Sequence, residues 1–240
     1  MELKAAVKSI QWTKVFLFYG ITLLGTYGVR KLPNLLQLAL AQVTDLHFAF
    51  NYNHGIFIAI IAWIFYKINN FKQEITLLGN HKLKALLFPV ILLTAYTITG
   101  ISNNNGVDPH SWAFLFCSLA LIYNSLEEYA WRGYLVEATG PLPYVFRSLV
   151  SGILWAIWHL VVFKDFDQYG GFGLFLLFCI VFSFILTFAV QRTQSILVAA
   201  AIHAFIIQMN ISALICLGLF LVLLFTWKRK PVTIEANRQN

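Results

Sequence analysis

Long apolar runs, separated by short polar segments, occupy most of the 240-residue chain. Several runs approach the roughly 20 apolar residues that a helix needs to cross a bilayer. The candidate spans cover residues 13–29, 55–67, 84–101, 111–138, 144–163, 171–190, 195–210 and 211–227. The pattern predicts an all-α, polytopic transmembrane helical bundle of about eight spans. Since the runs leave no room for a second unit, residues 1–240 are predicted to form a single integral membrane domain.

The segment before the second span is harder to assign. The second span is short, and the region from Arg30 to Asn53 holds Asp45, His47 and a run of Leu and Ala. We expect this region to form an interfacial helix or to help complete the second span.

Composition supports a membrane protein. Apolar residues make up 59% of the chain and charged residues only 11%, with a mean hydropathy of +0.72, whereas about 25% of the residues of a soluble domain are charged. A soluble core is therefore excluded.

The cysteines lie within apolar runs without metal-ligand spacing and are interpreted as packing residues; they are Cys117, Cys179 and Cys216.

The net charge of +7 comes from short basic clusters between the apolar runs, and not from one basic surface. This distribution is typical of the cytoplasmic face of a membrane protein and excludes nucleic acid as a partner. The clusters expected on that face are the N-terminus, the Lys67–Lys84 loop, Arg147, Arg192 and the tail Lys228–Lys230. The chain is predicted to cross the inner or plasma membrane several times, with the lipid bilayer as its solvent and both termini in the cytoplasm. Arg30, Lys31 and Lys164 are exceptions to this pattern.

Three charges interrupt the predicted span 111–138: Glu127, Glu128 and Arg132. Each charge at the centre of a membrane helix costs about 2.5–3.5 kcal/mol, so such residues face protein or water and serve a purpose. Glu128 and Arg132 are one helical turn apart, a spacing that allows an ion pair. Asn124 extends the same face, and Glu127 is left without a local cation. Glu127 is therefore the first candidate for chemistry.

Two histidines lie deep in later apolar runs, His159 and His203. At about 1.5 Å per helical residue, Glu127, His159 and His203 lie roughly 16, 22 and 15 Å from the predicted cytoplasmic ends of their spans. One carboxylate and two imidazoles at similar depth fit either the ligand set of a divalent metal such as zinc or a general-base site around one water. Both arrangements predict hydrolysis.

Other aromatic and histidine residues are given simpler interpretations. Trp131, Trp155 and Trp158 are expected to serve in packing, or to line a substrate groove. The remaining histidines fall in loops or near the ends of spans, and no function is predicted for them; they are His47, His54, His81 and His110.

The charged and histidine positions resemble the motifs of the intramembrane CAAX-protease and bacteriocin-processing (CPBP or Abi) protease family, which is related to type II CAAX prenyl endopeptidases. Glu127, Glu128 and Arg132 match its first motif, two glutamates followed after three residues by arginine. Its second motif, a Phe and a His four residues later, is matched by Trp155 and His159, with Trp in place of Phe.

The third motif of the family is a His followed four residues later by Asn or Asp. His203 fits this motif, but Ile207 stands at the second position. Asn210, two turns after His203, is the candidate substitute, and Gln208 is a weaker one. The resemblance covers about Ser111 to Asn210, and residues 111–210 are predicted to be the catalytic core.

The resemblance implies an intramembrane endopeptidase that depends on a glutamate or a metal. Its substrate would be a membrane-associated peptide or protein, prenylated or not. Glu127 and His159 would activate water while His203 and the third-motif amide hold the oxyanion; alternatively, Glu127, His159 and His203 would bind the metal.

Three further hypotheses compete with a protease. A noncatalytic immunity or regulatory partner of the same family would account for the departure at Ile207. A proton-coupled transporter would also need buried carboxylates and histidines. A haem site built from His159 and His203 would leave Glu127 and Glu128 unexplained.

Overall fold

The computed structural model describes residues 3–48 and 50–228. Within these residues the regular secondary structure is helical, and an isolated β-bridge joins Thr76 to Ser195. The longer helices are α2 (Trp12–Val29), α4 (Tyr52–Ile68), α5 (Lys82–Thr99), α6 (Pro109–Glu128), α8 (Tyr144–Trp158), α9 (Phe172–Thr193), α10 (Ile196–Ala204) and α11 (Ile211–Phe225). The shorter helices are α1 (Leu3–Ser9), α3 (Leu35–Leu40), α7 (Val136–Ala138) and the segments η1 (Tyr129–Leu135), η2 (His159–Val161), η3 (Asp167–Tyr169) and η4 (Phe205–Ile207).

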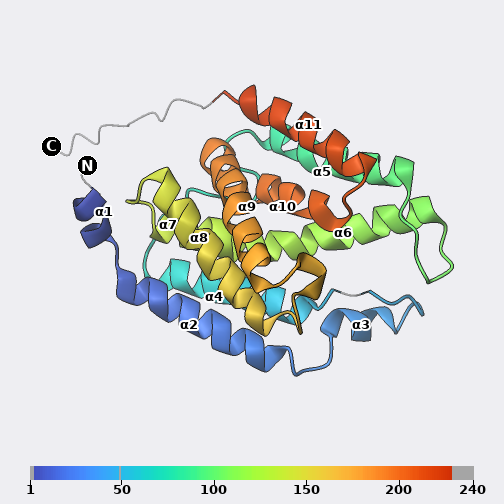
Figure 1. Ribbon diagram of the computed structural model, residues 1–240, viewed down its shortest axis with the longest axis horizontal. Helices are drawn as coiled ribbons and strands as arrows, with labels where there is room; N and C mark the ends of the chain where they lie inside the picture. Colours follow the sequence, from blue (N-terminus) through green and yellow to red (C-terminus); the bar gives the residue numbers. More distant parts are fainter. Residues whose placement is uncertain (1–2, 49, 229–240) are drawn as a thin grey trace.

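The helices form a bundle around α6, which crosses its middle (Figure 1). On one side, α2 packs along α4, and on the other, α5 packs along α11. The most extensive helix contact joins α8 to α9. Helix α10 lies inside, packed against α5, α6 and α9. This arrangement brings the ends of α6, α8 and α10 together in the interior.

A helix occupies each predicted span, and the predicted helical membrane bundle is confirmed. By length and composition, the helices able to cross a membrane are Lys82–Thr99, Tyr144–Val161 and Phe172–Thr193, with Tyr52–Ile68 and Ile211–Phe225 as shorter apolar helices. The predicted span 195–210 differs. Its helix α10 has 9 residues and so rises about 14 Å, against about 30 Å for the hydrocarbon core. Because most of its residues are buried, α10 is a core helix.

The segment between Arg30 and Asn53 contains α3, as expected of a short helix before the second span. Helix α4 itself begins at Tyr52, three residues earlier than the sequence predicts, because the Asn51 side chain caps it by accepting from Asn53 N–H. The earlier start places His54 inside the helix and not ahead of it. His54 is buried, at 2% exposure.

The outer surface of the bundle is apolar. Large side chains such as Leu24, Ile98 and Phe225 are 68–74% exposed, and Phe178 of α9 is 39% exposed. Exposed apolar surface on this scale is typical of a protein embedded in lipid, and the chain is a membrane protein.

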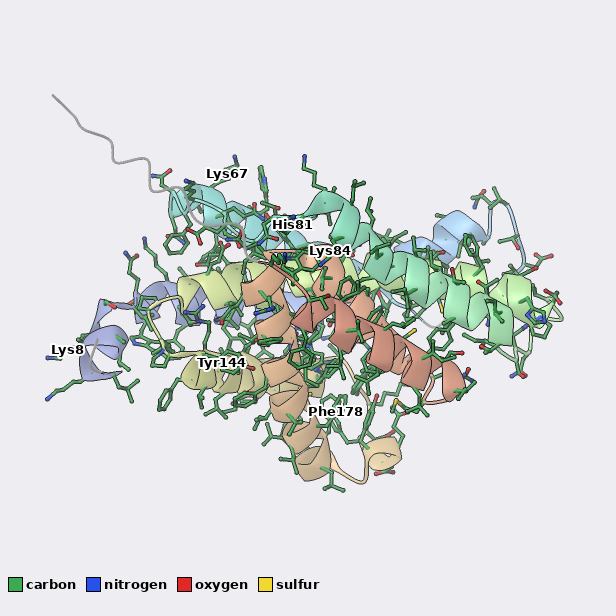
Figure 2. The ribbon with its side chains drawn as sticks, turned by 90° about the horizontal axis from the view of Figure 1, so that it is seen from above. Lys8, Lys67, His81, Lys84, Tyr144 and Phe178 are labelled. Atoms are coloured by element: carbon green, nitrogen blue, oxygen red, sulfur yellow. The ribbon has the colours of Figure 1, made fainter. Side chains whose placement is uncertain are left out.

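Lys8 and Lys67 lie toward the end of the long axis where α2 begins and α4 ends (Figure 2). Arg229 and Lys230 of the predicted cytoplasmic tail lie outside the described residues.

Helix α6 starts at a strong N-terminal signal. Asp108 accepts hydrogen bonds from the backbone N–H groups of His110 and Ser111, and Pro109 occupies the first helical position. These donors, that of Ser111 first, lower the pKa of Asp108 below its usual value. The cap therefore carries a charge that the helix dipole favours.

The contact between α8 and α9 depends on Gly152. A Cβ at this position would lie 2.8 Å from Ile180 Cα and 3.1 Å from the Cys179 carbonyl oxygen. Both atoms belong to the backbone of α9, so the helices can approach this closely only without a side chain at residue 152.

We therefore expect Gly152→Ala to destabilise the protein by about 1–2 kcal/mol, although alanine favours a helix more than glycine does. Gly20→Ala on α2 is the matched control, because a Cβ there meets nothing within 4 Å. Unfolding of the purified protein in detergent measures both. Equal stability of the two variants would contradict this account of the α8–α9 contact.

Candidate active site

The two glutamates end α6 at the point where the helix widens. Residues Tyr129–Leu135 form a π-helix, whose hydrogen bonds run from residue i to i+5. Such segments are rare and occur frequently at functional sites. Most of η1, including Arg132, is buried. The sequence does not predict this segment, because 7 residues are too few to show a helical period of their own.

Glu128 and Arg132 form the predicted ion pair. Arg132 Nη1 lies 3.0 Å from Glu128 Oε1, and both side chains are fully buried. Arg132 Nη2 donates a second hydrogen bond, 2.8 Å long, to Ser183 Oγ of α9. The pair thus also ties the end of α6 to α9.

His203 binds Glu128 and not Glu127. Its Nδ1 donates to Glu128 Oε1 at 2.8 Å, so Glu128 Oε1 serves both His203 and Arg132. The glutamate that His203 contacts through Nδ1 is therefore the one that also holds Arg132. Because a carboxylate accepts, Nδ1 carries the hydrogen, and Nε2 is left for other partners.

His159 ends α8 and begins η2. Its Nδ1 donates to the Trp155 carbonyl oxygen at 2.7 Å. A carbonyl oxygen only accepts, so in the neutral ring Nε2 carries the lone pair and is free to accept a proton. The rings of Phe163 and Phe175 flank the imidazole, with centroids 4.9 and 5.0 Å from its own.

Trp155 is the common neighbour of these groups. Its ring centroid lies 5.1 Å from the centroids of both His159 and His203. The Arg132 guanidinium carbon lies 4.4 Å from the ring centroid, and the indole N–H points to Glu127 Oε2 at 3.4 Å. The predicted convergence of Glu127 and the two histidines is thus present around one indole. Trp155 therefore adds to the predicted packing or groove-lining role, since its N–H is a donor that Phe lacks.

The predicted metal set does not fit as the side chains lie. Among residues 3–48 and 50–228, no three His, Cys, Asp or Glu side chains are grouped closely enough to hold a metal ion. The Trp155 ring contacts both imidazoles, and Nδ1 of each is already bound to an oxygen. Zinc therefore stays a prediction from the sequence.

Asn210 lies outside the site. Its Oδ1 caps α11 by accepting from the N–H groups of Ser212 and Ala213, and its amide nitrogen points to Gln208 Oε1. The Gln208 side chain is exposed, so neither residue supplies the missing third-motif amide in this arrangement.

Three polar residues near the site were missed from the sequence: Ser183, Tyr123 and His54. Tyr123 carried a usable signal, because it precedes Glu127 by one helical turn and shares its face. Ser183 and His54 come from other helices, and only the fold brings them near.

Residues 109–209 match the family model described as Type II CAAX prenyl endopeptidase Rce1-like. The matched region begins at the first turn of α6 and includes Glu127, Glu128, Arg132, His159 and His203. The match confirms the resemblance to CAAX-type proteases, and at family level it indicates an intramembrane endopeptidase. Neither the search of curated proteins nor that of solved structures found a match to the chain.

The buried ion pair gives a stability prediction. Arg132→Met should destabilise the protein by about 3–5 kcal/mol, because Glu128 then stays buried without its cation. Glu128→Gln combined with Arg132→Met should recover part of this loss, since no buried charge remains unpaired. Lys8→Met, at an exposed lysine, is the control and should stay within about 0.5 kcal/mol of the wild type. Unfolding in detergent tests the set, and a double variant less stable than Arg132→Met would contradict it.

Proposed function

We propose that the protein is an intramembrane endopeptidase in which Glu127 and His159 activate a water molecule. One observation carries the proposal: Glu127, His159 and the Glu128-bound His203 meet around Trp155, in the buried interior of a membrane bundle. Buried ionisable residues in a membrane protein are expensive and are kept for function.

Glu127 and the free Nε2 of His159 are the proton acceptors of the proposed site. One of them takes a proton from water as the water oxygen attacks the carbonyl carbon of the scissile peptide bond. The same proton then passes to the departing amine nitrogen as the carbon–nitrogen bond breaks. The products are a carboxylic acid and an amine, which balances the hydrolysis.

His203 is proposed to hold the oxyanion of the tetrahedral intermediate. In its protonated form, Nε2–H donates to the oxyanion while Nδ1–H stays bound to Glu128. Glu128 plays the part of a carboxylate that orients an imidazole and stabilises its charged form. Arg132 and Ser183 in turn fix Glu128 against α9.

The proposed substrate is a peptide or protein that is itself associated with the membrane, prenylated or not. The apolar outer surface of the bundle supports this class, because a substrate that shares the bilayer reaches the buried site without leaving lipid.

Glu127→Gln should lower the cleavage rate by at least about 10²-fold and leave folding and insertion unchanged, because the amide cannot accept the proton. Glu74→Gln, the same change at an exposed glutamate, should cleave like the wild type. The assay uses purified protein in lipid with a membrane-anchored peptide.

Metal analysis covers the same preparations together with His159→Ala and His203→Ala. It distinguishes water activation without a metal from a mechanism in which these residues bind a metal. Substoichiometric metal together with loss of cleavage in Glu127→Gln supports the water mechanism without a metal. Full cleavage by Glu127→Gln would refute the proposed role of Glu127, whereas a wild type that cleaves no peptide would favour a noncatalytic binding partner.

A further inference from the structure

A second hydrogen-bonded pair lies one turn before Glu127. His54 Nε2 and the Tyr123 hydroxyl share a short hydrogen bond between α4 and α6. Neither His54 nor Tyr123 belongs to the family motifs recognised in the sequence. His54 is almost fully buried, and its ring packs at 5.5 Å from that of Trp158, the residue before His159.

The packing around Tyr123 holds its ring in place. A Cβ at Gly55 would lie 3.1 and 3.3 Å from two carbons of the Tyr123 ring, so the ring rests directly on the backbone of α4. The rings of Phe50 and Tyr52 lie 5.7 Å from the Tyr123 ring. The hydroxyl is therefore a fixed group and not a mobile one.

Glu127 lies four residues after Tyr123, on the same face of α6, and its carboxylate is buried. His54 Nδ1 is buried without a partner, and since an unpaired acceptor is tolerated better than an unpaired N–H, the hydrogen of that ring lies on Nε2. The Tyr123 oxygen then accepts from His54 Nε2, which leaves the hydroxyl hydrogen for the neighbouring carboxylate, a group that only accepts.

We propose that Tyr123 and His54 are positioning residues for Glu127. The His54 N–H orients the Tyr123 hydroxyl, and that hydroxyl holds the carboxylate from the α4 side. The Trp155 indole N–H, 3.4 Å from Oε2, holds it from the α8 side. The inference rests on the proposed function and adds to it two residues that no motif contains.

Tyr123→Phe removes the donor and keeps the ring. We expect kcat to fall about 10-fold or more with KM within about 2-fold, since a hydrogen bond to a charged group contributes enough for a factor of this size. Tyr52→Phe is the matched control. It removes another hydroxyl between α4 and α6, which donates to the Leu119 carbonyl and not to Glu127, and kcat should stay within about 2-fold of the wild type.

The proposed direction of the pair is tested at His54. His54→Gln places an amide N–H near the position of Nε2 and should retain most of the kcat, whereas His54→Leu should lose as much as Tyr123→Phe. Because both residues act through one hydroxyl, the double variant Tyr123→Phe with His54→Leu should be no worse than Tyr123→Phe alone. Additive losses would overturn the inference.

The outcomes separate this inference from the proposed function. If Glu127→Gln is inactive while Tyr123→Phe and His54→Leu keep the wild-type kcat, the inference fails and the protease stands. If the wild type cleaves no peptide, the protease fails, and unfolding of Tyr123→Phe, Glu127→Gln and their double variant in detergent decides the inference. Non-additive stabilities support the Tyr123–Glu127 contact, and additive ones overturn it.

Discussion

The buried cluster of Glu128, Arg132 and His203 is the constraint on which the interior depends. An ion pair with no exposed surface repays its desolvation only with close geometry and further hydrogen bonds. Here Glu128 Oε1 accepts from both Arg132 and His203, and Arg132 donates to Ser183. These partners come from η1, α10 and α9, so bringing two donors to one carboxylate oxygen and anchoring the guanidinium requires three helical segments to meet at a fixed register.

The same requirement explains the unusual elements nearby. Helix α10 is too short to span a bilayer, yet it reaches the depth at which His203 meets Glu128. The wider turn of η1 follows directly after Glu128 and carries Arg132. Trp155 completes the enclosure, because its face lies against the guanidinium and both imidazoles pack against it in T-shaped arrangements. A cation on the face of a buried aromatic ring is a stabilising contact.

Much of this could be predicted from the sequence. Apolar runs placed a helix at every span, and the spacing of Glu128 and Arg132 predicted their ion pair, because both features are local. The partner of His203 could not be predicted, since adjacent glutamates differ by only about 100° around a helix and the packing of α10 decides between them. Asn210 looked available from its spacing on a continuous helix. The helix instead ends with η4, and Asn210 caps the start of α11. His54 was placed outside a helix because the Asn51 cap extends α4 past the apolar run.

The two adjacent carboxylates have different surroundings, and this difference supports different roles. Glu128 is bound by a cation and an imidazole, so its charge is already used in holding the structure. Glu127 is approached by the indole N–H of Trp155, a neutral donor, and lies one turn after the neutral hydroxyl of Tyr123. Neutral donors fix the position of a carboxylate without cancelling its charge, so Glu127 stays able to accept a proton. These surroundings support the proposed division of the pair, in which Glu128 builds the site and Glu127 is free to act in it.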